Sequence, residues 1–468
     1  MADVVVVSNR GPLSFRMEGD EPVPAGTAGG LAGTLYRLLV GTGATWVASA
    51  MGEADRRAAA AGLMAVGGLR VVTLEPEPDV YRMAYDVVSN ASLWFAHHHL
   101  FDLPRRPRPD RRWTEAWDAY RTFNRQFADQ VAAEAPEGAA VLVQDYHLSL
   151  LGSMLAGSRP DLRTVHFSHT PFADPNMLRC LPDRAVGELL SGMAGFGACG
   201  FHTARWEAAF RAAFADPTLA ALAGTDTPPL TFVVPLGPSP DVLADQAASP
   251  AVAAARQRLD RELGDRKVVV RVDRVELSKN LLRGLWAFEE LLEVHPRWRG
   301  EVTMLALAYP SRQGLAEYLA YRAEVEHTVD RINGAWGGGD WTPVVLDVAD
   351  DLDRSMAALT RYDVLLVNPV RDGLNLVAKE GPLVNTTAGV VVLSREAGAW
   401  EELSGAAVGV NPFDVGGTAE ALVQALEMDA DERARRAGSL RSTVRAQTAA
   451  DWLHRQLEVA ESLTPPAR

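Results

Sequence analysis

Lysine is almost absent from this chain. Among 468 residues there are 46 basic ones, and only Lys267, Lys279 and Lys379 are lysines. In a chain that has drifted toward arginine, a lysine is expected to persist where a compact ammonium fits and a wide guanidinium does not. Chance survival is the alternative. Lys279 and Lys379 are therefore candidate functional residues, whereas no motif surrounds Lys267.

Cysteine and long apolar runs are also scarce, and each absence excludes a class of protein. Cys180 and Cys199 are too few for a disulfide framework or a Cys-built metal site, so we interpret them as core thiols in a reducing cytosol. The longest apolar runs, such as Val4 to Val7, have the length of a strand, so we expect no membrane span. No basic segment precedes the first strand, which argues against a signal peptide and favours a cytoplasmic protein.

The net charge of −14 argues against nucleic acid as a partner. The composition, with 47% hydrophobic and 23% charged residues, is that of an ordinary globular protein. The length exceeds that of one compact core, so we expect two domains.

Strand-like and helix-like segments alternate along the whole chain, which indicates parallel sheets covered by helices. Strands are predicted at 4–8, 69–74, 139–144, 162–168, 230–235, 267–272, 301–308, 342–347, 363–368 and 388–393. Helices are predicted at 111–134, 147–156, 203–215, 281–294, 313–334, 351–360 and 375–384. The Pro/Gly-dense stretch 235–240 separates two such series. The predicted domains are therefore 1–237, 238–448 and a C-terminal helix, 449–468, that packs back on the first.

The loop after strand 267–272 carries the strongest chemical signal. Arg274 and Lys279 lie five residues apart beside an expected helix start, where they could bind a diphosphate. Fixed cations can stabilise the charge that develops on a leaving phosphate without a metal. The alternative is a solvated loop with Asp273–Arg274 and Glu276–Lys279 ion pairs.

A second loop, 368–380, follows strand 363–368. Asp372 and Gly373 are expected to make a turn, after which the backbone amides of residues 374–377 begin a helix that can bind a phosphate. Asp372 would then be free to accept a sugar hydroxyl, and Glu380 could accept both hydroxyls of a ribose. The alternative is an N-cap aspartate and a surface glutamate.

The first half of the chain supplies complementary pieces. The glycine-rich stretch 26–31 precedes a helical pattern, so its backbone could approach a phosphate. Asp145 and His169 follow neighbouring predicted strands and could orient sugar hydroxyls. The run 97–99 is three histidines, but consecutive side chains diverge on a helix, so we favour packing and capping there.

Metal binding is not expected. Two Asp-x-Asp sequences, 351–353 and 429–431, have a spacing that some transferases use for manganese. Both begin or lie inside predicted surface helices, at 351–360 and in the helical tail 429–464, away from the loops described above, so we interpret them as helix-start acids.

Together these motifs resemble those of trehalose-6-phosphate synthases, glycosyltransferase family 20, over nearly the whole chain. The matching pieces are Ser8-Asn9-Arg10, Gly29-Gly30-Leu31, Ser89-Asn90 with Leu93-Trp94, Asp145-Tyr146-His147-Leu148, His169-Thr170-Pro171-Phe172, Val272-Asp273-Arg274, Arg371-Asp372-Gly373 through Glu380, and Leu393-Ser394 with Ala397-Gly398-Ala399. Lys279 is followed by Asn280, where the family often has glycine.

The resemblance implies an α/β fold of two Rossmann-like, doubly wound domains facing a cleft, the GT-B architecture. It implies a retaining transfer of glucose from GDP- or UDP-glucose to glucose 6-phosphate, giving α,α-trehalose 6-phosphate. No metal or other cofactor is implied. The departing phosphate would take the acceptor proton, so no enzymic nucleophile is expected.

The resemblance also implies roles for individual residues. The expected catalytic residues are Asp372, His169, Arg274 and Lys279. The donor would be bound by Gly30, Arg274, Lys279, Asp372, Gly373, Leu374, Asn375, Leu376, Val377 and Glu380, with His169 at its 6-hydroxyl. The acceptor would be bound by Arg10, Trp46, Tyr85, Trp94, Asp145 and Arg312.

Three other functions remain as alternatives. A pseudoglycosyltransferase similar to validoxylamine phosphate synthases would couple a nucleotide-cyclitol to an aminocyclitol phosphate; the retained Asn9-Arg10, Tyr85 and Trp94 favour the sugar-using enzyme. A non-catalytic regulatory subunit would be favoured by loss of Arg274, Lys279 or Asp372, which are all present. A glycosidase would need a recognisable carboxylate pair. The nucleotide base and the oligomeric state, including a homo-oligomer, stay open.

Overall fold

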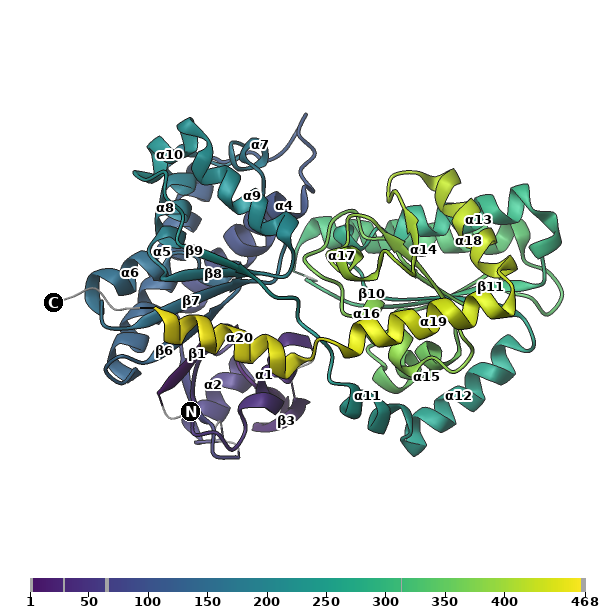
Figure 1. Cartoon of the computed structure of the whole chain (residues 1–468), viewed down its shortest axis with the longest axis horizontal. Coiled ribbons are helices and arrows are strands. Elements are labelled where there is room, and N and C mark those ends of the chain that lie inside the picture. The colour runs from purple at the N-terminus through teal and green to yellow at the C-terminus, as the bar shows by residue number, and fades with distance from the viewer. Residues whose placement is uncertain (1–2, 28–29, 64–66, 313, 464–468) are drawn as a thin grey trace. The chain divides into compact units, whose positions relative to one another are not determined.

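The computed structural model describes residues 3–27, 30–63, 67–312 and 314–463 (Figure 1). The chain forms two compact units. The first comprises Met1–Pro235 and Ala449–Arg468, and the second comprises Leu236–Thr448. No helix among the described residues is long and apolar enough to cross a membrane.

The first unit is built on a seven-stranded parallel sheet in the order β5-β4-β1-β6-β7-β8-β9. Its strands are β1 (Val4–Arg10), β4 (Thr45–Ser49), β5 (Arg70–Leu74), β6 (Ala140–Gln144), β7 (Arg163–Ser168), β8 (Ala198–Phe201) and β9 (Leu230–Val233). A hairpin of β2 (Leu13–Glu18) and β3 (Glu21–Thr27) stands apart from this sheet. Valine-rich strands such as β1 are buried along nearly their whole length, as expected for a sheet that helices cover on both faces.

The helices of the first unit are α1 (Gly30–Leu39), α2 (Glu53–Ala60), α3 (Pro78–Arg82), the π-helix η1 (Met83–Leu93), α4 (Trp94–His98), α5 (Arg111–Glu134), the 3-10 helix η2 (Tyr146–Leu148), α6 (Leu151–Ser158), α7 (Pro175–Leu178), α8 (Asp183–Ala194), α9 (Ala204–Ala215), α10 (Pro217–Ala223) and α20 (Ala449–Ser462). The helix α20 contacts α1 and the strands β6, β7 and β8 (Figure 1). The C-terminal helix is thus part of the first unit's core.

The second unit has a six-stranded parallel sheet in the order β12-β11-β10-β13-β14-β15. Its strands are β10 (Lys267–Arg274), β11 (Val302–Tyr309), β12 (Val344–Asp347), β13 (Val364–Val367), β14 (Val390–Ser394) and β15 (Val408–Val410). Its helices are α11 (Pro240–Ala247), α12 (Pro250–Leu263), η3 (Leu277–Lys279), α13 (Leu281–Val294), η4 (Pro296–Trp298), α14 (Ala316–Trp336), α15 (Leu352–Arg361), α16 (Val377–Val384), α17 (Trp400–Leu403), α18 (Val415–Glu427) and α19 (Ala430–Arg445).

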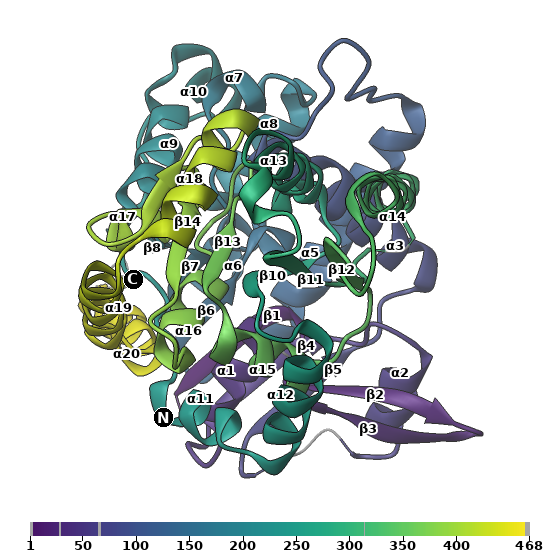
Figure 2. The ribbon, with the colours of Figure 1, turned by 90° about the vertical axis from the view of Figure 1, so that its right-hand side faces the viewer.

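Each face of this second sheet carries its own hydrophobic core. One core packs against α11, α12, α15, α16 and α19, and the other packs against α13, α14 and α18 (Figure 2). Both sheets are doubly wound, so the loops that follow the strands gather at one edge of each sheet, where ligands of such folds bind.

Candidate active site

The loop after β10 contains a 3-10 helix that was not predicted. Lys279 ends this 3-10 helix, Leu277–Lys279, and α13 begins at Leu281, as predicted. Between them Asn280 adopts the left-handed conformation, with φ 59° and ψ 42°, which asparagine tolerates better than most residues. Its side-chain amide donates to the carbonyls of Asn368 at 3.0 Å and Pro412 at 2.8 Å, so Asn280 ties this loop to those after β13 and β15.

Lys279 and Asp372 are brought together from the two predicted loops. Lys279 Nζ lies 2.5 Å from Asp372 Oδ2, and Asn375 Nδ2 donates to the same oxygen at 3.1 Å. Burial alone would lower the pKa of Lys279, but attraction to Asp372 holds it above its ordinary value. Lys279 is therefore a charged ammonium, and Asp372 is engaged by it instead of being free as expected.

Glu276 is a buried carboxylate that joins two other expected site residues. Its Oε1 lies 2.5 Å from a guanidinium nitrogen of Arg312, 3.1 Å from one of Arg274, and accepts a hydrogen bond from Ser311 Oγ at 2.7 Å. The side chain has no exposed surface. Burial acts to raise the pKa of Glu276, but Arg274, Arg312 and Lys279 together lower it to about 2. Glu276 therefore stays ionised and holds both arginines near one point.

The alternative of a solvated loop is wrong. Asp273 bonds to Arg271 Nε at 3.0 Å and to its Nη2 at 2.8 Å, and both side chains are buried. Arg271 also donates to the carbonyl of Lys279 at 3.0 Å, so it supports the loop from inside the sheet. Arg271 and Glu276 were not predicted to be supporting residues, although a lone arginine within the valine run of β10 was a usable signal.

The loop after β13 presents backbone donors beside Asp372. Within the part of the chain that the structure describes, the N–H groups of Leu374, Asn375 and Leu376 have no hydrogen-bond partner. Asn375 has a φ of 79°, and its Oδ1 accepts from the N–H of Ala378 at 3.2 Å. The helix α16 consequently begins at Val377, two residues later than predicted.

Gly373 and Gly398 fix the position of this loop. A Cβ on Gly398 would lie 2.0 Å from the Gly373 carbonyl oxygen, so only glycine allows the segment after β14 to approach so closely. The Gly398 N–H also donates to the Asp372 carbonyl at 3.0 Å.

Glu380 and Lys379 follow on α16 with different surroundings. Glu380 is partly exposed, whereas Lys379 is fully buried. Lys379 Nζ bonds to both carboxylate oxygens of Glu402, at 2.9 and 2.8 Å, and to the carbonyl of Leu236 at 3.0 Å. Burial lowers the pKa of Lys379, against the effect of Glu402. Lys379 is a core residue that holds the segment entering the second unit.

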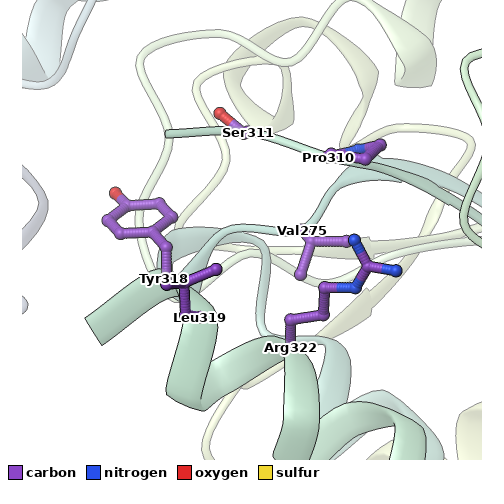
Figure 3. A pocket seen from close by; sticks show the side chains of 6 residues that line it. All are labelled: Val275, Pro310, Ser311, Tyr318, Leu319 and Arg322. Carbon is purple, nitrogen blue, oxygen red and sulfur yellow. The ribbon is translucent and has the colours of Figure 1, made fainter. Parts of the chain in front are cut away.

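A pocket lies beside Arg312 in the second unit. It is lined by Val275, Pro310, Ser311, Tyr318, Leu319 and Arg322 (Figure 3). The guanidinium carbon of Arg312 lies 5.5 Å from the centroid of the Tyr318 ring, and the Arg312 backbone has a φ of 45°.

In the first unit, Asp145 has a strained backbone. It follows β6 with φ 71° and ψ 169°, a region that is open almost only to glycine. Its Oδ1 accepts a hydrogen bond from the N–H of His169, which follows the neighbouring β7, at 3.3 Å. The expected proximity of these two residues is therefore present, and the strain marks Asp145 as a residue held in place by its surroundings.

Both ring nitrogens of His169 are engaged within the first unit. Nε2 lies 2.9 Å from Gln144 Oε1, and Nδ1 lies 3.1 Å from His202 Nε2. Burial, together with His202 and His166, lowers the pKa of His169 well below its ordinary value, so the imidazole is neutral. Gln144 and His202 were not singled out from the sequence.

The four remaining acceptor-side candidates of the first unit differ in exposure. Arg10 is exposed at the end of β1 and donates to Ser14 Oγ at 2.7 Å. Tyr85, on η1, stacks against His147, with ring centroids 5.7 Å apart. Trp94 is 7% exposed and stacks on His98, with ring centroids 3.8 Å apart.

Trp46 differs from these candidates. It is completely buried in β4, and its indole N–H donates to Ser8 Oγ at 2.8 Å. Trp46 therefore supports the core instead of facing a ligand.

Gly30 begins α1 with a left-handed φ of 62°. The other glycine of the expected close approach, Gly29, lies outside the described residues, as does Ala28. Of the stretch 26–31, residues 26 and 27 end β3 and residues 30 and 31 begin α1.

The histidine and Asp-x-Asp sequences have structural roles, as predicted. His97 accepts from the N–H of Ala173 at 3.1 Å, and His99 ends α4 in a left-handed conformation. Asp351 and Asp429 cap α15 and α19, accepting from the N–H groups three residues on. Among the residues that the structure describes, no group of three or more His, Cys, Asp or Glu is placed to hold a metal.

Comparison with known proteins gives a consistent result. The model of glycosyltransferase family 20 matches residues 2–462. A trehalose-6-phosphate synthase of Salmonella paratyphi B is 33% identical over 99% of this chain and 96% of its own length. A bifunctional trehalose-6-phosphate synthase/phosphatase of Thermoproteus tenax is 33% identical over 82% of this chain. The alignment spans about half of that larger protein, 53% of its length.

Solved structures share the whole fold. An E. coli structure bound with UDP-2-fluoro glucose superimposes with a TM-score of 0.83 at 28% identity, covering 99% of both chains. An α,α-trehalose-phosphate synthase (UDP-forming) of Burkholderia xenovorans in complex with glucose-6-phosphate superimposes with a TM-score of 0.83 at 29% identity. The match covers 98% of this chain and 100% of that one.

The predicted fold class, two Rossmann-like doubly wound domains of the GT-B type, is confirmed by this match. The predicted enzyme class, a trehalose-phosphate synthase-type glycosyltransferase, is confirmed by its relatives. With the family model covering nearly every residue, the chain belongs to glycosyltransferase family 20.

Proposed function

We propose that this protein transfers glucose from a nucleotide-glucose to glucose 6-phosphate, with retention, and forms α,α-trehalose 6-phosphate. The observation that carries this proposal is the cluster of Arg274, Lys279 and Asp372 beside the unpaired amides of Leu374 to Leu376. Two cations suit a diphosphate, and a carboxylate with adjacent N–H donors suits the hydroxyls of a hexose.

On the donor side, Arg274 and Lys279 hold the diphosphate and stabilise the charge on the leaving oxygen. Asp372, Gly373 and the amides up to Val377 hold the glucosyl ring, and Glu380 holds the ribose. Gly30 approaches the diphosphate. His169 lies at the 6-hydroxyl, which would take the place of His202 as the hydrogen-bond partner of His169 Nδ1. UDP-glucose is the favoured donor, because relatives are named UDP-forming and one is bound with UDP-2-fluoro glucose.

On the acceptor side, Arg10, Tyr85 and Arg312 bind the phosphate, and Trp94 and Asp145 bind the sugar ring. A relative in complex with glucose-6-phosphate supports this acceptor. We include no metal in this mechanism, because fixed cations supply the charge. We also propose a cytoplasmic location, because a chain with only two cysteines does not rely on disulfides for its stability.

A donor panel tests the proposal. UDP- and GDP-glucose are each incubated with glucose 6-phosphate, and the product is identified by mass and by NMR. We expect a disaccharide phosphate with α configuration at both anomeric centres. Reaction only between a nucleotide-cyclitol and an aminocyclitol phosphate would establish the pseudoglycosyltransferase instead.

A further inference from the structure

Two buried glutamines link the C-terminal helix to His169. Gln144, the last residue of β6, is 1% exposed, and Gln456, on α20, is fully buried. Gln144 Nε2 donates to Gln456 Oε1 at 3.3 Å across 312 residues of sequence. A buried amide costs stability unless it is hydrogen-bonded, so apolar side chains would be the simpler way to pack α20 on this sheet.

The hydrogen bonds that link Gln456, Gln144 and His169 all donate in the same direction. Gln456 Nε2 donates to the Trp452 carbonyl at 3.5 Å, and a carbonyl can only accept. Gln456 Oε1 must then accept from Gln144 Nε2, which leaves Gln144 Oε1 to accept from His169 Nε2 at 2.9 Å. A proton on His169 Nε2 leaves Nδ1 of the neutral ring to accept from His202 Nε2 at 3.1 Å.

The same helix also fixes the plane of the imidazole. Trp452 is fully buried, and its ring centroid lies 5.6 Å from that of His169 and 5.2 Å from that of Phe167. His169 is thus held at its two nitrogens by Gln144 and His202, and against one side by an aromatic ring from α20. The carboxylate of Asp145 accepts a hydrogen bond from the backbone N–H of His169.

We propose that Gln456 is a positioning residue of the donor site: acting through Gln144, it fixes the Nε2–H tautomer and the orientation of His169. The helix α20 then contributes to the donor site by orienting His169, although α20 follows the second unit in sequence. The proposal rests on the proposed function for the role of His169 at the donor sugar. The tautomer itself does not depend on that function.

The experiment combines NMR of the imidazole with kinetics. Long-range ¹H–¹⁵N correlation of histidine-labelled protein reports which nitrogen of His169 carries the proton, and His169→Gln assigns the signal. We expect Nε2–H in the wild type. Gln456→Met removes the acceptor that orients Gln144, and Gln144→Met removes the partner of Nε2. Both should shift His169 toward the Nδ1–H tautomer.

In the same two variants, kcat/KM for the nucleotide-glucose should fall about tenfold, whereas the KM for glucose 6-phosphate stays unchanged. Val459→Ala is the matched control, because it trims a buried apolar contact of the same helix one turn away. It should lower the melting temperature without moving either the tautomer or the kinetics.

An Nδ1–H tautomer in the wild type would overturn the proposal, and this result stands even if the variants fail to fold. A tautomer that survives both substitutions, or one that changes without any loss of donor kcat/KM, would overturn it as well. If the wild-type protein transfers glucose from no nucleotide donor, the proposed function fails, and the NMR spectra still decide whether the two glutamines orient His169.

Discussion

Lys279 and Asp372 form an ion pair of 2.5 Å between loops that lie 93 residues apart in sequence. Their side chains are 12% and 14% exposed, so the pair is shielded from most of the solvent. Asp372 holds the ammonium in a fixed position, which means that little reorganisation is needed when charge develops nearby.

Replacement of Lys279 by alanine should lower kcat about a hundredfold, because one lost cation opposite a developing phosphate charge costs roughly 3 kcal/mol. The KM for the acceptor should change little. Steady-state kinetics with both substrates varied will measure this. Lys267→Ala is the control: this lysine pairs with Asp363 at 2.9 Å, is half-exposed, and should leave kcat unchanged. A Lys279→Ala enzyme within threefold of wild type would contradict the assignment.

Much of the fold was predictable because its signals are local. The helices 111–134 and 281–294 have the predicted bounds, and valine runs gave strands such as β1 and β10. The hairpin β2–β3 and the π-helix η1 were not anticipated, since neither leaves a clear periodicity.

The candidate site was predictable only where residues follow strands in a sheet. Asp145 and His169 are such a pair. Gln456 acts on His169 from a helix at the other end of the chain, and no local pattern distinguishes a buried glutamine on an amphipathic helix from an exposed one. The sequence showed that Asn280 stands where the family often has glycine. Its two hydrogen bonds to the distant carbonyls of Asn368 and Pro412 could be found only in the structure.

The strained backbone of Asp145 predicts an unusual ranking of variants. Asp145→Ala and Asp145→Gly both lose the carboxylate, and both should be inactive. Only glycine relieves the backbone strain, which is worth about 1 kcal/mol or more. The glycine variant should therefore melt about 2 °C or more above the alanine variant in differential scanning calorimetry. Equal melting temperatures would show that the conformation is not strained.

Arg10 should distinguish a phosphorylated acceptor from a free sugar. It is exposed at the end of β1, where its guanidinium can bind a phosphate in bidentate fashion. Arg10→Ala should raise the KM for glucose 6-phosphate about tenfold and leave the donor KM unchanged. Arg16→Ala, an exposed arginine paired with Glu18, is the control. Equal losses with glucose and glucose 6-phosphate would assign Arg10 to folding.

Transfer should survive chelation. Arg274 and Lys279 place two positive charges at the proposed diphosphate site, and we propose that these replace a divalent ion in stabilising the leaving group. Activity measured after dialysis against EDTA should equal that of untreated enzyme. Loss of activity that magnesium or manganese restores would mean that the charges of these two residues do not suffice.

Glu276 should make part of the stability of the second unit depend on acid pH. Burial opposes its ionisation, but Arg274, Arg312 and Lys279 lower its pKa from 4.5 to about 2. A group whose pKa is lower in the folded state stabilises that state above the unfolded pKa, and this stabilisation is lost as pH falls through the folded value. The contribution is at most about 3 kcal/mol, and it should disappear between about pH 4.5 and pH 2.

Glu276→Gln tests this directly. The amide keeps the shape but leaves Arg274 and Arg312 without their shared charge, so the melting temperature at pH 7 should fall. Because the titrating group is gone, the difference between wild type and variant should shrink as pH falls toward 2. The KM values for donor and acceptor should both rise, since Glu276 pairs with Arg274, which we propose binds the donor, and with Arg312, which we propose binds the acceptor. A difference in melting temperature that is constant from pH 7 to pH 2 would show that Glu276 contributes shape and not charge.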